Sequence, residues 1–131
     1  MQPRILIADD APYMRQMLCE IIEPLGYEVV AEASSGLEAV ELFALYQPDV
    51  VTLDMVMPRS SGIDAVRMIL NRFPGAKIVM AGALGQESLV VDALEAGAIN
   101  FITKPYQPFA VEHALANALE KPMDSFEDAA D

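Results

Sequence analysis

The fold of this 131-residue chain is decided by the stretch Val50-Val51-Thr52-Leu53-Asp54, an apolar run that ends in a carboxylate. A run this rich in valine and leucine is typical of a strand that is covered on both faces of a parallel sheet. The same arrangement occurs twice more, where Asp9-Asp10 follow one apolar run and Lys104 follows another. Polar groups at the carboxyl ends of parallel strands meet in one crevice of an open α/β sheet. The sequence therefore predicts a polar site at that edge.

Short apolar runs alternate with helical patterns along the chain. Strands are predicted at 4–8, 27–33, 49–53, 77–82 and 99–103. Between and after them, apolar residues recur with helical spacing in five segments. Pro12 suits the first turn of the first helix, and Ser35 is the predicted N-cap of the second. Five βα units predict an α/β fold with an open parallel sheet and helices on both faces, because a barrel would need eight.

Composition and charge exclude several classes of protein. No apolar run approaches the ~18 residues that a membrane span requires. Twenty acidic against eight basic residues give a net charge of −12, and phosphate contacts need clustered cations, so no nucleic-acid partner is expected. The single cysteine, Cys19, cannot form an internal disulfide and fits a reducing cytoplasm. We expect a cytoplasmic protein with one domain at 1–121 and an acidic, disordered tail at 122–131.

Three carboxylates and a lysine at one sheet edge are suited to chemistry on a phosphate group. Asp9, Asp10 and Asp54 would repel one another, and a divalent cation, with help from Lys104, would relieve that repulsion. A carboxylate that attacks phosphorus forms an acyl phosphate, and phosphoryl transfer depends mainly on positioning and charge stabilisation. Helix capping alone would explain Asp9-Asp10. It does not explain Asp54 and Lys104 at two further strand ends.

Four motifs in order carry a resemblance to a known family. They are Ile7-Ala8-Asp9-Asp10, Leu53-Asp54-Met55-Val56-Met57-Pro58, Ala83-Leu84-Gly85-Gln86 and Phe101-Ile102-Thr103-Lys104-Pro105. With these motifs, the chain from about residue 3 to 121 resembles the receiver domain of two-component response regulators, and especially the single-domain, CheY-like chemotaxis type. The resemblance implies a flavodoxin-like (βα)5 fold with strand order 2-1-3-4-5.

The resemblance also implies a role for each residue of the site. Asp54 would be the phosphoacceptor, taking a phosphoryl group from a histidine kinase, and Lys104 would pair with a phosphoryl oxygen. Mg²⁺ or Mn²⁺ would be bound by Asp10, by Asp9 directly or through water, by Asp54, and by the backbone carbonyl of Val56.

One position departs from the family pattern. The family has Ser or Thr 22 positions before the lysine, at the end of the fourth strand, and this chain has Gly82. In the family that hydroxyl binds the phosphoryl group, and an aromatic residue, here Phe101, swings inward behind it. We expect Gly82 to remove this contact, to loosen the backbone and to leave space for an inward Phe101 ring even without phosphate. Lys104 and the backbone N–H of Ala83 would still bind the phosphoryl group and so favour the active state in part. Phosphorylation would therefore change the conformation less than in relatives with Ser or Thr.

A protein of this type is a signalling switch and not an enzyme that acts on small molecules. The resemblance implies a monomer whose partners are the kinase and a downstream protein, the latter bound on the face of the fourth helix, fifth strand and fifth helix. It also implies a cis bond before Pro105. Chemotaxis or flagellar motor control, a phosphorelay intermediate and a phosphate sink all stay open as roles.

Two other classes of protein fit the sequence less well. A phosphatase of the haloacid dehalogenase type needs a second Asp two residues after the first, and this chain has Val56 there. A flavodoxin-like electron carrier needs a Ser/Thr/Gly-rich phosphate loop after the first strand, where Asp9-Asp10 would repel phosphate. The lone His113 is expected to be a solvated residue of the fifth helix.

Overall fold

Five parallel strands form one open sheet in the order β2-β1-β3-β4-β5, as predicted. The computed structural model describes residues 2–58 and 61–120, and the predicted tail lies outside them. The strands are β1 (Arg4–Ala8), β2 (Glu28–Ala33), β3 (Val50–Asp54), β4 (Ile78–Ala83) and β5 (Asn100–Lys104).

Three strands are shifted by one residue from their predicted bounds, and β2 begins one residue later. Asp54 and Lys104 are therefore the last residues of β3 and β5, and β4 continues past Gly82 to Ala83. The shift arises because the ladder extends to the site edge, where the N–H of Met55 donates to the Ala81 carbonyl at 2.8 Å. The sheet itself thus fixes the backbone beneath the phosphoacceptor candidate.

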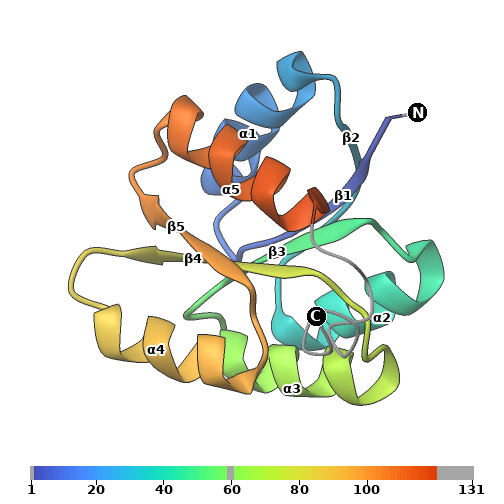
Figure 1. Ribbon diagram of the computed structural model, residues 1–131, viewed down its shortest axis with the longest axis vertical. Helices are drawn as coiled ribbons and strands as arrows, with labels where there is room; N and C mark the ends of the chain where they lie inside the picture. The colour runs from blue at the N-terminus through green and yellow to red at the C-terminus, as the bar shows by residue number, and fades with distance from the viewer. Residues whose placement is uncertain (1, 59–60, 121–131) are drawn as a thin grey trace.

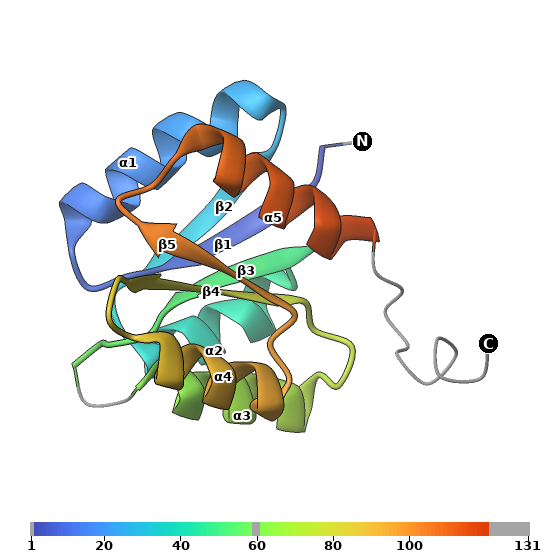
Figure 2. The same cartoon turned by 60° about the vertical axis from the view of Figure 1, so that its left-hand side comes forward.

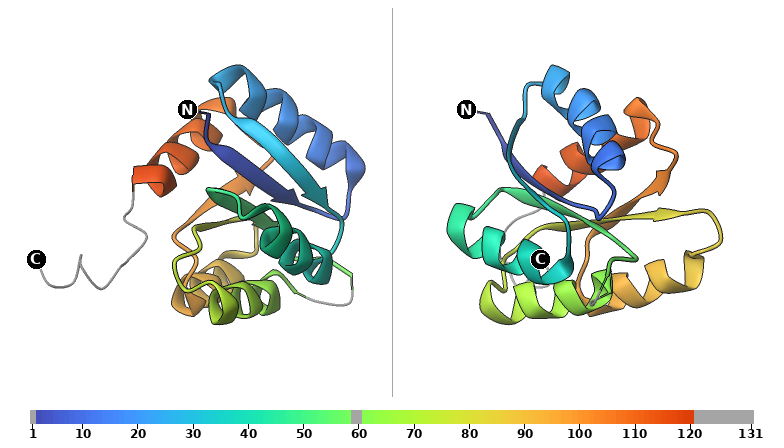
Figure 3. Two further views of the ribbon diagram at one scale, coloured as in Figure 1. Left: turned by 90° about the vertical axis from the view of Figure 1, so that its right-hand side faces the viewer. Right: turned by 180° about the vertical axis from the view of Figure 1, so that it is seen from behind.

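Helices cover both faces of the sheet, which makes three layers (Figures 1 and 2). The helices α1 (Pro12–Ile22) and α5 (Pro108–Glu120) lie on one face, and a 3₁₀ turn (Glu23–Leu25) follows α1. The other face carries α2 (Gly36–Tyr46), α3 (Gly62–Arg72) and α4 (Glu87–Ala96). Figure 3 shows these three side by side. Within the described residues, no helix is both long and apolar enough to cross a membrane.

The sheet separates two apolar clusters, because alternate residues of a strand point to opposite faces. Ile5 and Ile7 belong to the cluster under α1 and α5, whereas Leu6 belongs to the cluster under α2, α3 and α4. All five residues of β3 are buried. Asp54 is therefore carried by a strand that cannot move without disturbing the packing on both sides.

Polar caps fix the starts of two helices near this edge. The Ser35 hydroxyl accepts from the N–H of Glu38 at 3.1 Å, which confirms the predicted cap of α2. Ser61 caps α3 in the same way, accepting from the N–H of Asp64 at 3.1 Å. The second cap was not predicted, although Ser followed by Gly and Ile offered the signal.

Gly62 lies where a larger residue does not fit. A Cβ on it would collide with the backbone carbonyl of Asp54 and lie 2.9 Å from Cε of Met80. Its N–H donates to the Met55 carbonyl at 3.0 Å. We expect Gly62→Ala to lower the free energy of unfolding by about 1–3 kcal/mol, because the loop after Asp54 must move. Urea denaturation measures this, and an unchanged midpoint would show that the contact does not constrain the loop.

Candidate functional site

The carboxyl edge of the sheet brings together three carboxylates and one ammonium group. One oxygen from each of Asp9, Asp10 and Asp54 lies within 4.8 Å of the other two. The Lys104 Nζ atom is 2.7 Å from Oδ2 of Asp9 and 3.3 Å from Oδ1 of Asp54. Residues that are far apart in the sequence thus meet because their parallel strands end at one edge.

Asp9 is held in place by its neighbours. It is buried; its Oδ1 accepts from the N–H of Ala11 at 2.9 Å, and its Oδ2 accepts from Lys104. Its backbone carbonyl accepts from Nη1 of Arg15 at 2.6 Å. Asp10, in contrast, is exposed at the rim of the cluster. Asp9 is therefore the fixed member of the pair, and Asp10 has the more accessible carboxylate.

The electrostatics of the site disfavour the ionised form of Asp54. Burial raises the pKa of Asp54 above its usual value, and the charges of Asp9 and Asp10 add to the rise, which Lys104 opposes in part. Burial alone would lower the pKa of Lys104, but its hydrogen bond to Asp9 and the charge of Asp54 outweigh burial and raise it. Three carboxylates against one ammonium leave two negative charges uncompensated.

We expect Asp54→Asn to raise the melting temperature of the metal-free protein at neutral pH. Because the pKa of Asp54 is raised in the folded state, its contribution to stability is fully present below the unfolded-state pKa. That contribution is lost as the pH rises through the folded-state pKa. The variant should lose this part of the pH dependence. Thermal melts of both proteins between about pH 3 and pH 8 in chelator test this, and an equal or lower melting temperature for Asp54→Asn at neutral pH would contradict it.

The donor set suits a hard divalent cation. Carboxylate oxygens are ligands that Mg²⁺ prefers, and it keeps several waters besides. A cation there would offset the uncompensated charge of Asp9, Asp10 and Asp54. Val56 is 56% exposed in the following loop, and its carbonyl as a ligand stays a prediction.

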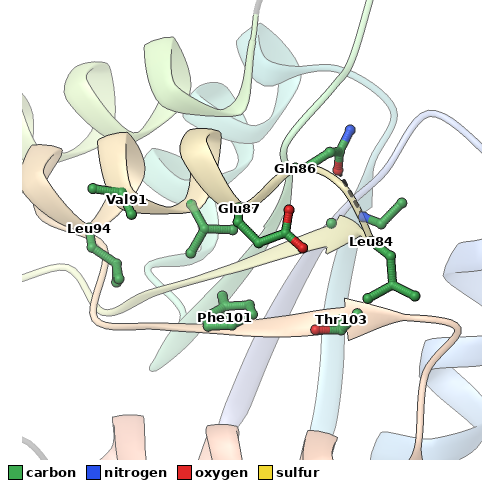
Figure 4. Close-up of a pocket in the computed structure, with 10 residues that line it drawn as sticks. Leu84, Gln86, Glu87, Val91, Leu94, Phe101 and Thr103 are labelled. Carbon is green, nitrogen blue, oxygen red and sulfur yellow. Dashed lines mark hydrogen bonds between the residues drawn. The ribbon is translucent and has the colours of Figure 1, made fainter.

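The switch residues lie beside this cluster, and here the expected inward position of Phe101 was wrong. Gly82 is a buried residue of β4, and the positive φ of this region, 94°, is at Gly85; a looser backbone at Gly82 stays a prediction. Phe101 is 43% exposed and lines a pocket between β5 and α4 (Figure 4), so its ring is not inward.

Gly82 and Phe101 line the same pocket of about 260 Å³, but the place of a side chain at position 82 itself is occupied. A Cβ on Gly82 would lie 2.8 Å from Oε1 of Gln86 and 2.8 Å from Cγ of Met55. These two side chains therefore lie where a side chain at position 82 would begin. Gln86 belongs to one of the four motifs, but the sequence did not show that its side chain would turn back to Ala83.

The start of the β5–α5 connection closes the site on the side of α5. The Lys104–Pro105 peptide bond is cis. Tyr106 is buried next to it, and burial together with the charges of Asp9 and Asp54 raises the pKa of its hydroxyl. The phenol therefore stays neutral. Exposed His113 stacks on Phe109 with ring centroids 6.4 Å apart, well outside the carboxylate cluster.

An open (βα)5 sheet with an acidic cluster and a lysine at its carboxyl edge defines the class of the receiver domains, and the comparisons agree. Residues 5–116 match the response regulator receiver domain family, to which this chain belongs. The chain is 50% identical over 115 residues to the chemotaxis protein CheY of Thermotoga maritima, covering 88% of this chain and 96% of that protein. It is 46% identical over 119 residues to CheY of Bacillus subtilis, covering 91% and 99%.

A solved structure of a similar protein has the same fold. The CheX–CheY complex of Borrelia burgdorferi, solved with BeF3 and Mg²⁺, contains a chain that matches with a TM-score of 0.85 and 33% identity. The match covers 90% of each chain. The chain is thus a CheY-like receiver domain, as its motifs predicted.

Proposed function

We propose that this protein is a phosphorylatable switch of a two-component system and that Asp54 is its phosphoacceptor. The observation that carries the proposal is the buried Asp54 carboxylate at the end of β3, with Lys104 3.3 Å away and Asp9 and Asp10 beside it. An Asp54 oxygen attacks the phosphorus of a phosphohistidine on a kinase. The P–N bond breaks, and the imidazole leaves with the electron pair and takes up a proton.

The residues of the chain have separate tasks in this reaction. Lys104 stabilises negative charge on a phosphoryl oxygen, and the sheet holds Asp54 in place for in-line attack. Asp9, Asp10 and Asp54 would hold Mg²⁺ or Mn²⁺, which supplies charge neutralisation for the incoming phosphoryl group. The CheY structure solved with BeF3 and Mg²⁺ supports this assignment, because BeF3 is a phosphoryl analogue.

The proposed output passes through a protein contact on α4, β5 and α5. This face carries several exposed apolar side chains: Leu84, Val91, Leu94, Phe101 and Phe109. A pocket of about 260 Å³ lies between α4 and β5. Apolar patches of this kind mark interaction sites on soluble domains. The CheY relatives favour a role in chemotaxis, with the phosphorelay role as the alternative.

The test is incubation with Mg²⁺ and acetyl phosphate, followed by intact mass spectrometry. The expected result is the gain of one phosphoryl group, which chelator prevents and which is lost at alkaline pH, as acyl phosphates are. No gain with metal present, in a protein that is shown to be folded, would contradict the proposal.

A further inference from the structure

Gln86 makes a contact within the β4–α4 loop that the proposed function does not explain. The side-chain Oε1 of Gln86 accepts from the backbone N–H of Ala83 at 2.8 Å. The backbone N–H of Gln86 donates to the Ala83 carbonyl at 3.3 Å. Figure 4 shows the side chain turned back from the start of α4 toward the end of β4, with the first of these bonds dashed. Gln86 therefore binds both polar groups of the Ala83 backbone.

The Ala83 N–H lies at the same edge as the phosphoacceptor. In the β4–β5 register Ala83 pairs with Lys104, and the Lys104 ammonium is 3.3 Å from Asp54. A phosphoryl group on Asp54 brings additional acceptor oxygens to this edge. One N–H serves one good acceptor at a time, so a phosphoryl oxygen and the Gln86 carboxamide oxygen compete for Ala83.

The glycine at position 82 is what lets Gln86 reach Ala83. A Cβ there would be 2.8 Å from the same Oε1 atom, which is closer than real Cβ contacts, and the far end of a glutamine is the part that would yield. A Ser or Thr at this position would therefore push the Gln86 carboxamide from its present place.

We propose that Gln86 is a positioning residue of this switch and that it acts through the Ala83 N–H. In the unphosphorylated protein its carboxamide caps the Ala83 N–H, and the phosphoryl group displaces it. The inference rests on the proposed function, since it needs phosphorylation of Asp54.

Displacement of the Gln86 carboxamide from the Ala83 N–H would affect the proposed partner-binding face on α4, β5 and α5. Gln86 is the N-cap residue of α4 through its backbone carbonyl, and its side chain makes no capping hydrogen bond to the helix, so the carboxamide can leave Ala83 without breaking a bond of α4. The same residue lines the pocket that Phe101 and Leu94 border. The state of the Ala83 N–H is thereby coupled to the shape of the pocket.

Hydrogen exchange at the Ala83 amide tests the cap without any ligand. Gln86→Met has a similar length and no charge but lacks the acceptor, and it should speed exchange at Ala83 about three- to tenfold. Ser88→Ala, a neutral change in the exposed first turn of α4, is the matched control and should leave it unchanged. Equal exchange at Ala83 in Gln86→Met and the unmodified protein would overturn the proposal.

Titration with beryllofluoride and Mg²⁺, followed by NMR, tests the competition. Gln86→Met should bind the analogue about three- to tenfold more tightly, because the Ala83 N–H is then available to it. Gln86→Glu keeps an acceptor and adds a negative charge, so it should bind more weakly than the unmodified protein. Unchanged or weaker binding by Gln86→Met would overturn the proposal, since the carboxamide would then be neutral or a donor to the analogue. Absence of binding by every variant would overturn the proposed function as well, whereas the exchange experiment would still report on the cap.

A double-mutant cycle with Gly82→Ser separates the cap from a general loosening of the loop. Because the serine Cβ displaces Gln86, adding Gln86→Met to Gly82→Ser should change the affinity for beryllofluoride less than twofold. A gain as large in the serine background as in the glycine background would show that Gln86 does not act through the position beside Gly82.

Discussion

Asp54→Asn is expected to abolish the gain of a phosphoryl group when the protein is incubated with Mg²⁺ and acetyl phosphate. Asparagine keeps the shape of the side chain but has no anionic oxygen to attack phosphorus, and its amide cannot form an acyl phosphate under these conditions. The loss should be complete, because the reaction needs this one nucleophile. Intact mass spectrometry of the two proteins, treated in parallel, measures it.

Asp92→Asn is the matched control, since it removes the same charge from an exposed position of α4. It should gain the phosphoryl group as the unmodified protein does. If Asp54→Asn gained the same mass, the nucleophile would lie elsewhere, and Asp9 and Asp10 would be the next carboxylates to replace.

Asp10→Asn should remove most of the stabilisation that Mg²⁺ gives. At a free metal concentration of 100 times Kd, a ligand that binds only the folded state adds about 2.7 kcal/mol to the free energy of unfolding. For a domain of this size that corresponds to a rise in Tm on the order of 10 °C. The variant loses an accessible carboxylate of the cluster, so a much smaller rise is expected.

Thermal melts with Mg²⁺ and with chelator measure the difference. Asp64→Asn, at an exposed position of α3, should keep the full metal-induced rise. An equal rise in Asp10→Asn and in the unmodified protein would remove Asp10 from the metal site. Parallel melts of Asp9→Asn would show whether the carboxylate bound by Lys104 and Ala11 also contributes.

The course of the backbone could be predicted from the sequence because its causes are local. Apolar runs of strand length and helical spacings gave the element order, and a parallel sheet then placed Asp9, Asp10, Asp54 and Lys104 at one edge. The cap at Ser35 was predicted for the same reason, since a cap bonds a residue only three positions away. The shifts of one residue at strand ends arose because ladder pairing with a neighbour, and not composition, decides where a strand stops.

The state of the switch was decided by tertiary structure. The glycine at position 82 indicated a space and an inward Phe101; Gly82 and Phe101 do line one pocket, but the ring is exposed. The sequence alone determined the fold and the set of charged groups at the site, because periodicity and strand order suffice for both. Only the folded chain decided which acceptor holds the Ala83 N–H, because that depends on how a loop places a flexible side chain within 2.8 Å of the end of another element.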